Sequence, residues 1–192
     1  MRSKTLEKYL LNKFELDNIK DINLEEVEEL LLNNNDNNGK KLDYDFRDFE
    51  NFKNLKYISL QNFEIKNFET NELNRCKKIS AIQFSNCKFK SKSRLQGNIK
   101  VISFNECKNF KIEYLSLLKD LEVLKISNLK KLDMKKAKFA IKNIEKLYLE
   151  NITICNFKSL SKLKKLKSIQ ILNCKLNQKV LKVFPKNIRI EV

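Results

Sequence analysis

A pattern of apolar residues recurs along this chain about every twenty residues, and it constrains the fold more than any other feature. Its clearest copy runs from Leu55 to Ile65 and reads Leu-x-x-Ile-x-Leu-x-x-Phe-x-Ile. Further copies begin at residues 79, 99, 121, 144 and 166, and a fainter one begins at residue 27. Successive starts are 28, 24, 20, 22, 23 and 22 residues apart, and such regular intervals indicate a repeat architecture.

The fourth and sixth positions of each copy are apolar and flank a more polar fifth position. This alternation predicts a short strand that buries one face. One such unit cannot bury its apolar face alone, whereas stacked units form a continuous core. We therefore expect an α/β solenoid, with a curved parallel sheet on its concave face and short helices or 3-10 turns on its convex face.

These repeated positions resemble the leucine-rich repeat superfamily over about residues 24 to 192. The resemblance implies the solenoid fold and implies that the chain binds other proteins. The abundance of Lys and Asn is similar to that of short leucine-rich repeat proteins of microsporidian parasites. The family usually has Asn or Cys at the ninth position, which here holds Cys87, Cys107 and Cys174 but also Phe63 and Leu129.

Residues 1–22 precede the first repeat, and Leu6, Leu10 and Phe14 follow one another there at helical spacing. We expect this segment to be a capping helix, because the first strand of a solenoid otherwise exposes its edge. Residues 23–192 then form one domain of about seven repeats and a final strand. Helical segments are expected on its convex side at residues 69–76, 113–118, 134–141, 158–163 and 179–184.

Asparagine occupies the eighth position of most copies. Two interpretations are open. The Asn side chains cap the turn after each strand by accepting backbone N–H bonds, or they form a row at the concave rim that binds a ligand. The residues concerned are Asn34, Asn62, Asn86, Asn128, Asn151 and Asn173.

The residue content argues against catalysis and against bound cofactors or metals. There is no His, which removes the commonest general base and imidazole metal ligand. Gly39 and Gly97 are isolated, so no Gly-rich phosphate loop is predicted, and no Cys-x-x-Cys pair suggests zinc. The five cysteines suit buried free thiols, although Cys76 and Cys155 lie outside the core positions. We predict that the chain is not an enzyme.

The net charge of +16 is unevenly distributed: residues 1–36 carry −4, so the remainder carries +20. One interpretation is a solvated outer face, enriched in Lys by an AT-rich coding sequence. The other is an electrostatic patch for an acidic partner or RNA. The candidate patch comprises Lys135, Lys136, Lys138, Lys164 and Lys165.

The concave face is expected to carry the residues between the buried strand positions. Its candidate binding residues are Tyr57, Gln83, Ser103, Lys125, Tyr148 and Gln170. This surface is mainly neutral and polar, and it predicts a non-catalytic module that binds a protein partner. One alternative is an RNA- or ribosome-associated basic protein that uses the outer face. Another is a structural protein that self-assembles through an open end of the solenoid.

The final strand is predicted from Ile188 and Ile190, which continue the apolar phase together with Val192. Its free edge, at Ile188, Arg189 and Ile190, is a candidate self-association site, so a monomer or an end-to-end oligomer is expected. No apolar run suits a membrane span or a secretory signal. A cytoplasmic location is therefore expected.

Overall fold

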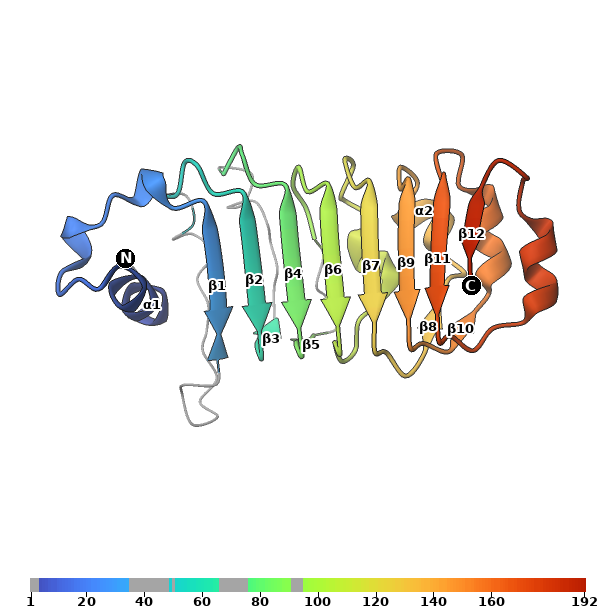
Figure 1. Cartoon of the computed structure of the whole chain (residues 1–192), viewed down its shortest axis with the longest axis horizontal. Coiled ribbons are helices and arrows are strands. Elements are labelled where there is room, and N and C mark those ends of the chain that lie inside the picture. Colours follow the sequence, from blue (N-terminus) through green and yellow to red (C-terminus); the bar gives the residue numbers. More distant parts are fainter. Residues whose placement is uncertain (1–3, 35–48, 50, 66–75, 91–94) are drawn as a thin grey trace.

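A computed structural model describes residues 4–34, 49, 51–65, 76–90 and 95–192 (Figure 1). The fold is α/β and is dominated by one eight-stranded parallel sheet, in the order β1-β2-β4-β6-β7-β9-β11-β12. The strands are β1 (Glu29–Asn33), β2 (Tyr57–Gln61), β4 (Ala81–Ser85), β6 (Val101–Asn105), β7 (Val123–Ser127), β9 (Lys146–Glu150), β11 (Ser168–Leu172) and β12 (Arg189–Glu191). Each copy of the repeated pattern therefore contributes one strand to a repeat-like sheet.

The alternation within the strands from β1 to β11 of the large sheet is confirmed by the burial of their side chains. The fourth pattern positions lie in one row across the sheet, and each is at most 2 % exposed: Leu30, Ile58, Ile82, Ile102, Leu124, Leu147 and Ile169. The sixth positions form a second buried row beside it. A slip of one residue in any strand would expose both rows, so this burial fixes the register.

Within the described residues, the segments after β6, β7, β9 and β11 contain short helical elements, three of which are 3-10 helices. They are η6 (Ile112–Leu115), η7 (Phe157–Lys162) and η8 (Gln178–Val183), and the α-helix α2 (Ala137–Ala140) joins them. In Figure 1, η6 and α2 lie behind the sheet, whereas η8 lies beyond β12 at the end of the sheet, and α2 packs between η6 and η7. Helical structure was predicted at these four places, whereas the helix predicted at 69–76 lies almost entirely outside the described residues. The two-residue pairs β3 (Glu64–Ile65) with β5 (Lys88–Phe89), and β8 (Leu132–Asp133) with β10 (Ile154–Cys155), were not predicted.

An aromatic cluster fills the middle of the core. The Phe104 ring is stacked on Phe84 with centroids 5.3 Å apart, and it lies 4.1 Å from the ring of Phe110. Phe89 makes edge contacts with Phe84 and Phe104 at 5.3 and 5.7 Å. Because Phe84 and Phe104 come from neighbouring strands, this cluster joins the first repeats to the later ones.

Helix α1 (Lys4–Phe14) lies beside β1, followed by η1 (Ile19–Asp21) and η2 (Leu24–Glu26) (Figure 1). Leu6 and Leu10 are fully buried. The Tyr9 hydroxyl accepts a bond from the Leu31 N–H at 3.1 Å, and the Lys13 ammonium donates to the Glu29 carbonyl at 2.9 Å. These two backbone groups point away from β2, so α1 bonds the strand edge that the sheet leaves unpaired.

The last strand follows the predicted phase only in part. Ile188 is buried and Ile190 is half-buried, while β12 pairs with β11 and the Arg189 guanidinium forms an ion pair with Glu191 at 2.5 Å. Val192 is 70 % exposed, so the prediction that it continues the buried phase was wrong. Self-association through this strand stays a prediction.

The asparagines after the strands adopt the left-handed conformation, with φ between 48° and 65° at Asn62, Asn86, Asn128, Asn151 and Asn173. Asn tolerates this region better than other non-Gly residues. The Asn86 amide donates to Asn62 Oδ1 at 2.6 Å, and the Asn151 amide donates to Asn128 Oδ1 at 2.8 Å. The side chains thus link neighbouring turns: within the described residues, the Oδ1 atoms of Asn62 and Asn128 accept from these side-chain amides, where bonds from backbone N–H groups were expected.

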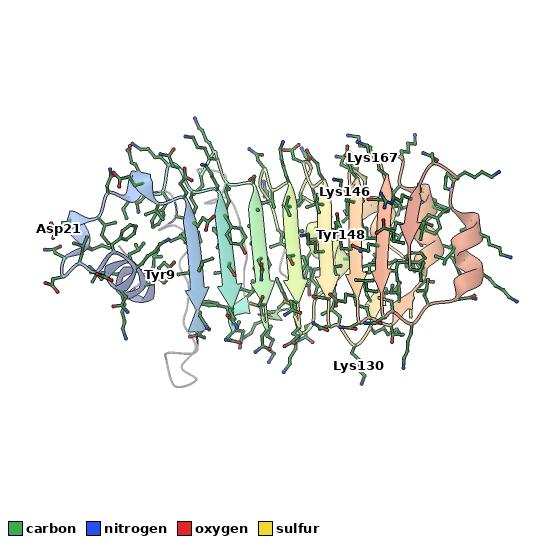
Figure 2. The ribbon with its side chains drawn as sticks, in the orientation of Figure 1. Tyr9, Asp21, Lys130, Lys146, Tyr148 and Lys167 are labelled. Carbon is green, nitrogen blue, oxygen red and sulfur yellow. The ribbon has the colours of Figure 1, made fainter. Side chains whose placement is uncertain are left out.

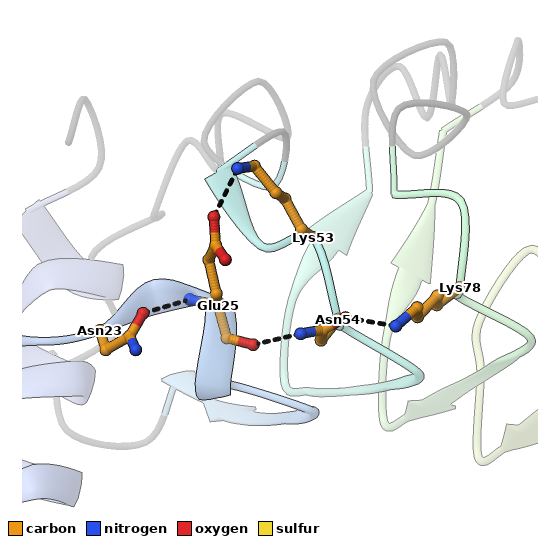
Figure 3. A network of polar contacts seen from close by, with 5 residues as sticks. All are labelled: Asn23, Glu25, Lys53, Asn54 and Lys78. Atoms are coloured by element: carbon orange, nitrogen blue, oxygen red, sulfur yellow. Dashed lines mark hydrogen bonds and ion pairs between the residues drawn. The ribbon is translucent and has the colours of Figure 1, made fainter.

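The opposite edge, where the strands begin, is held by a polar network (Figure 3). The Asn54 amide donates to the Glu25 carbonyl at 2.7 Å and accepts a bond from Lys78 at 2.5 Å. Glu25 also forms an ion pair with Lys53, and the Asn23 side chain accepts its backbone N–H at 3.1 Å. Three consecutive turns are therefore connected at this edge.

No helix in the described part of the chain is long and apolar enough to cross a membrane.

Candidate functional site

One face of the sheet carries the first, third and fifth side chains of each strand from β2 to β11, and we call it the open face. Its central row contains Ser59, Gln83, Ser103, Lys125, Tyr148 and Gln170, which are neighbours by strand register. Five of the six predicted binding residues therefore lie in one line. Most of them are half-buried, and Lys125 is exposed.

Tyr57 was predicted on the same surface as these residues, and it lies on the open face in the row adjacent to this line. Its register partner on β4 is Ala81, while Gln83 pairs with Ser59. The row differs because Tyr57 occupies the third pattern position and the other residues occupy the fifth. The Tyr57 hydroxyl nevertheless donates to Gln83 Oε1 at 2.8 Å, so the two side chains meet.

The adjacent row contains a feature that the sequence reasoning missed. Ala81, Val101 and Val123 follow Tyr57 on successive strands, and all three are half-buried on the open face. They form a short aliphatic strip between Tyr57 and Lys146. The sequence contains a signal for this strip, because small aliphatic residues recur at the third position of the repeated pattern.

A hollow of about 350 Å³ lies in the later part of the open face. Its lining includes Ser103, Lys125, Tyr148, Glu150, Gln170 and Leu172. The Lys125 ammonium lies 5.4 Å from the centroid of the Tyr148 ring, which is the geometry of a cation–π contact. Figure 2 shows Lys146 and Tyr148 along the same strand, β9. The volume is at the small end of the range for ligand sites.

Lysines at the edge of the sheet are neutralised, in contrast to those on the open face. Lys56 pairs with Glu28 at 2.6 Å, and Lys167 pairs with Glu145 at 2.6 Å. The hydrogen bond from Lys167 lowers the pKa of the Glu145 carboxyl. These pairs are solvent-exposed and contribute little to stability, so their main effect is to cancel charge locally.

The candidate basic patch lies on the outer face, away from the open face. Its residues, Lys135, Lys136, Lys138, Lys164 and Lys165, are all exposed. The first three flank or belong to α2, and the last two follow η7, which packs against α2. Lys136 is partly neutralised by Glu113, with its ammonium 3.1 Å from the carboxylate.

Phe139 was not singled out from the sequence, yet it is 68 % exposed in the middle of this basic surface. The Lys138 ammonium lies 4.5 Å from its ring centroid. The helical spacing of Phe139 within a Lys-rich segment was the available signal, because it places the ring on the side opposite the buried Ala137 and Ala140.

All five cysteines are free thiols in the structure. Cys76, Cys87 and Cys107 are buried, as the repeat predicts for the last two, whereas Cys155 and Cys174 are half-buried. A hydrogen bond with Cys87, together with burial, raises the pKa of Cys107. Burial also raises the pKa of Cys174. Within the described ranges, no three His, Cys, Asp or Glu side chains lie close enough to hold a metal ion.

No protein-family model matches the chain, and no curated protein is significantly similar to it. The class of protein is therefore defined by the structure alone, as an α/β protein with a repeat-like parallel sheet and a polar open face.

Proposed function

We propose that the chain belongs to the leucine-rich repeat superfamily and acts as a non-catalytic module that binds a protein partner. Support comes from the agreement between the repeated pattern and the in-register parallel strands, of which β6, β7, β9 and β11 are each followed by a short helical segment. The bonds from Tyr9 and Lys13 to β1 support the role of residues 1–22 as an N-terminal cap.

The observation that carries the proposal is the open face itself. Six strands, from β2 to β11, present a mainly polar surface, and a hollow of about 350 Å³ lies beside Tyr148. Tyr is enriched at the energetic centres of protein interfaces because its ring is large and rigid and its hydroxyl is polar. The row around Tyr148 is built on strands, so its side chains are held in a fixed spacing.

The test is site-specific crosslinking in a native lysate. A photocrosslinking amino acid in place of Gln170 samples the open face, and the same amino acid in place of Lys164 samples the outer face. We expect a discrete protein adduct from position 170, resistant to nuclease, and none from position 164. The double variant Lys125→Ala with Tyr148→Ala should weaken the captured partner by more than about 1 kcal/mol, which is roughly fivefold.

A second candidate function is RNA binding by the outer face, and Phe139 is the observation that favours it. An exposed ring among lysines can stack on a base while the ammonium groups contact phosphates. The same experiment separates the two functions. A nuclease-sensitive adduct from position 164, with none from position 170, would refute the protein-binding proposal and support this one.

A further inference from the structure

The two parts of the open face differ in the hydrogen bonding of their polar side chains. In the earlier part, the Tyr57 hydroxyl donates to Gln83, and the Gln83 amide donates to Ser85 Oγ at 3.1 Å. The three side chains therefore satisfy one another's hydrogen-bonding groups, both between neighbouring strands and within β4. A ligand that bonded them would first have to break these contacts, so this part is poorly suited to polar recognition.

The later part is satisfied internally only at Ser127, whose hydroxyl donates to Asn105 Oδ1 at 3.0 Å. Among the described residues, the side chains of Ser103, Tyr148 and Gln170 form no hydrogen bond, although all three line the hollow. They are half-buried, so their polar atoms are only partly solvated. A ligand can therefore bond them without displacing an existing protein contact.

The lysine ammonium groups beside the hollow are also available to bind a ligand. Lys125 and Lys146 are exposed; Lys125 lies opposite Tyr148 on the neighbouring strand, and Lys146 lies two residues before Tyr148 on β9. Within the described part of the chain, neither ammonium group forms an ion pair, in contrast to Lys56 and Lys167 at the sheet edge. Two unpaired cations beside one ring attract a carboxylate.

The other side of the hollow has a different chemistry. Glu150 is exposed and can accept a bond from a backbone N–H of a ligand, and Leu172 is 44 % exposed beside it. A free anion would satisfy the lysines but would be repelled by Glu150 and would leave Leu172 uncovered. An extended polypeptide satisfies all three, because it has N–H groups, acidic side chains and aliphatic ones.

We propose that this part of the open face binds an extended acidic segment of the partner protein, in which a carboxylate residue adjoins an aliphatic one. Lys125 and Lys146 hold the carboxylate, Tyr148 and Leu172 contact the aliphatic side chain, and Glu150 accepts a backbone N–H. This inference rests on the proposed function and specifies the chemistry of its partner.

The experiment uses the full chain and three labelled twelve-residue peptides, in which Val alternates with Asp, Asn or Lys. Fluorescence anisotropy measures binding at physiological salt. We expect the Asp–Val peptide to bind about tenfold more tightly than the Asn–Val peptide. In the double variant Lys125→Glu with Lys146→Glu, the preference should pass to the Lys–Val peptide.

The matched control is Lys164→Glu with Lys165→Glu, which changes the net charge equally on the outer face. It should retain the preference for the Asp–Val peptide within about twofold. All four positions are exposed, so circular dichroism and the unfolding midpoint should be unchanged in both variants.

Equal binding of the Asp–Val and Asn–Val peptides, or no binding of either, would overturn the inference. So would an equal loss in the outer-face control, because it would show attraction by net charge alone. Competition by poly(U) that depends on Lys125 would assign the site to nucleic acid. If position 170 still crosslinks a protein partner while acidic peptides are not preferred, this inference fails and the proposed function stands.

Discussion

The open face is built from one repeated backbone, yet its earlier and later parts have different surfaces. Around β2 and β4, Tyr57, Gln83 and Ser85 are bonded to one another. Around β7 and β9, Lys125 and Tyr148 border a hollow and leave their polar groups available. The buried rows are alike in both parts, so the repeat determines the scaffold and the open positions determine what the scaffold can bind.

The two parts are joined by the aromatic cluster at β4 and β6. Phe104 is fully buried, and it contacts Phe84 on one side and Phe110 on the other. In a repeat protein each unit is stabilised mainly by its neighbours, so the coupling between the parts depends on this junction.

The largest expected effect comes from truncating that junction. Phe104→Ala should lower the free energy of unfolding by about 3–5 kcal/mol, because it leaves a cavity between stacked rings. We also expect the two parts to unfold at separate denaturant concentrations. Amide hydrogen exchange along the chain, measured through a denaturant series, would resolve the two transitions.

Leu147→Ala is the matched control, since Leu147 is equally buried but lies within the later part. Leu147→Ala should lower the free energy of unfolding by about 2–5 kcal/mol, but it should not separate the unfolding transitions of the two parts. If Phe104→Ala unfolds in a single transition that coincides at every amide, the parts are not coupled chiefly through this cluster.

The strands could be predicted from the sequence because burial on one face imposes a period of two, and stacking imposes the spacing of the repeats. The convex segments at 113–118, 134–141, 158–163 and 179–184 were located correctly, but the sequence left open whether they are helices or 3-10 turns, since elements of four to six residues can take either form. The hollow could not be predicted. Its availability depends on which side chains bond each other, as Tyr57 and Gln83 do and as Tyr148 and Gln170 do not.

The asparagine turns are a second case in which the sequence showed the position of a feature but not its hydrogen bonds. Their position was evident from the sequence, but the bond from one Asn to the next depends on the spacing between turns. That spacing became known only with the structure. One turn departs from the rule, because Glu106 has φ 54° where its equivalents are asparagine. It lies after β6, at the boundary between the two parts.

A smaller effect follows from replacing this residue. Glu106→Asn should raise the free energy of unfolding by about 1 kcal/mol, because Asn tolerates positive φ better than Glu. The Asn128 amide already bonds Asn105 at the end of β6, so the gain should come mainly from the backbone. Urea unfolding measures the change.

The converse control is Asn86→Glu, which places Glu in an equivalent turn with φ 48° and removes the bond to Asn62. It should destabilise the protein by at least as much as Glu106→Asn stabilises it. A neutral result for both variants would mean that the asparagine turns do not contribute to the coupling of the two parts.

The smallest effect concerns acid stability, where the outer turns of the two parts again differ. Between β3 and β5 the link is the ion pair of Lys90 with Glu64 at 2.6 Å. Between β8 and β10 the Asn156 amide donates to Asp133 Oδ1 at 2.8 Å, and the Lys135 N–H donates to the same oxygen at 2.8 Å. The hydrogen bond from Asn156, followed by that from Lys135, lowers the pKa of Asp133 below its usual 3.8.

Because the pKa is lower in the folded state, the unfolded state binds the proton more readily as the solution is acidified. The stabilisation from Asp133 is therefore fully present above about pH 4 and is lost as the pH falls through the lowered pKa. Asp133→Asn removes the charge, so it should cost less than about 1 kcal/mol at pH 7, given the solvent screening of an exposed group. The difference from wild type should vanish at the most acidic pH at which the protein stays folded.

Unfolding by urea across this pH range tests this prediction. Asp120→Asn is the control, since that exposed side chain forms no hydrogen bond among the described residues. A difference that stays constant down to the acid limit would show that Asp133 acts through its shape and not through its charge.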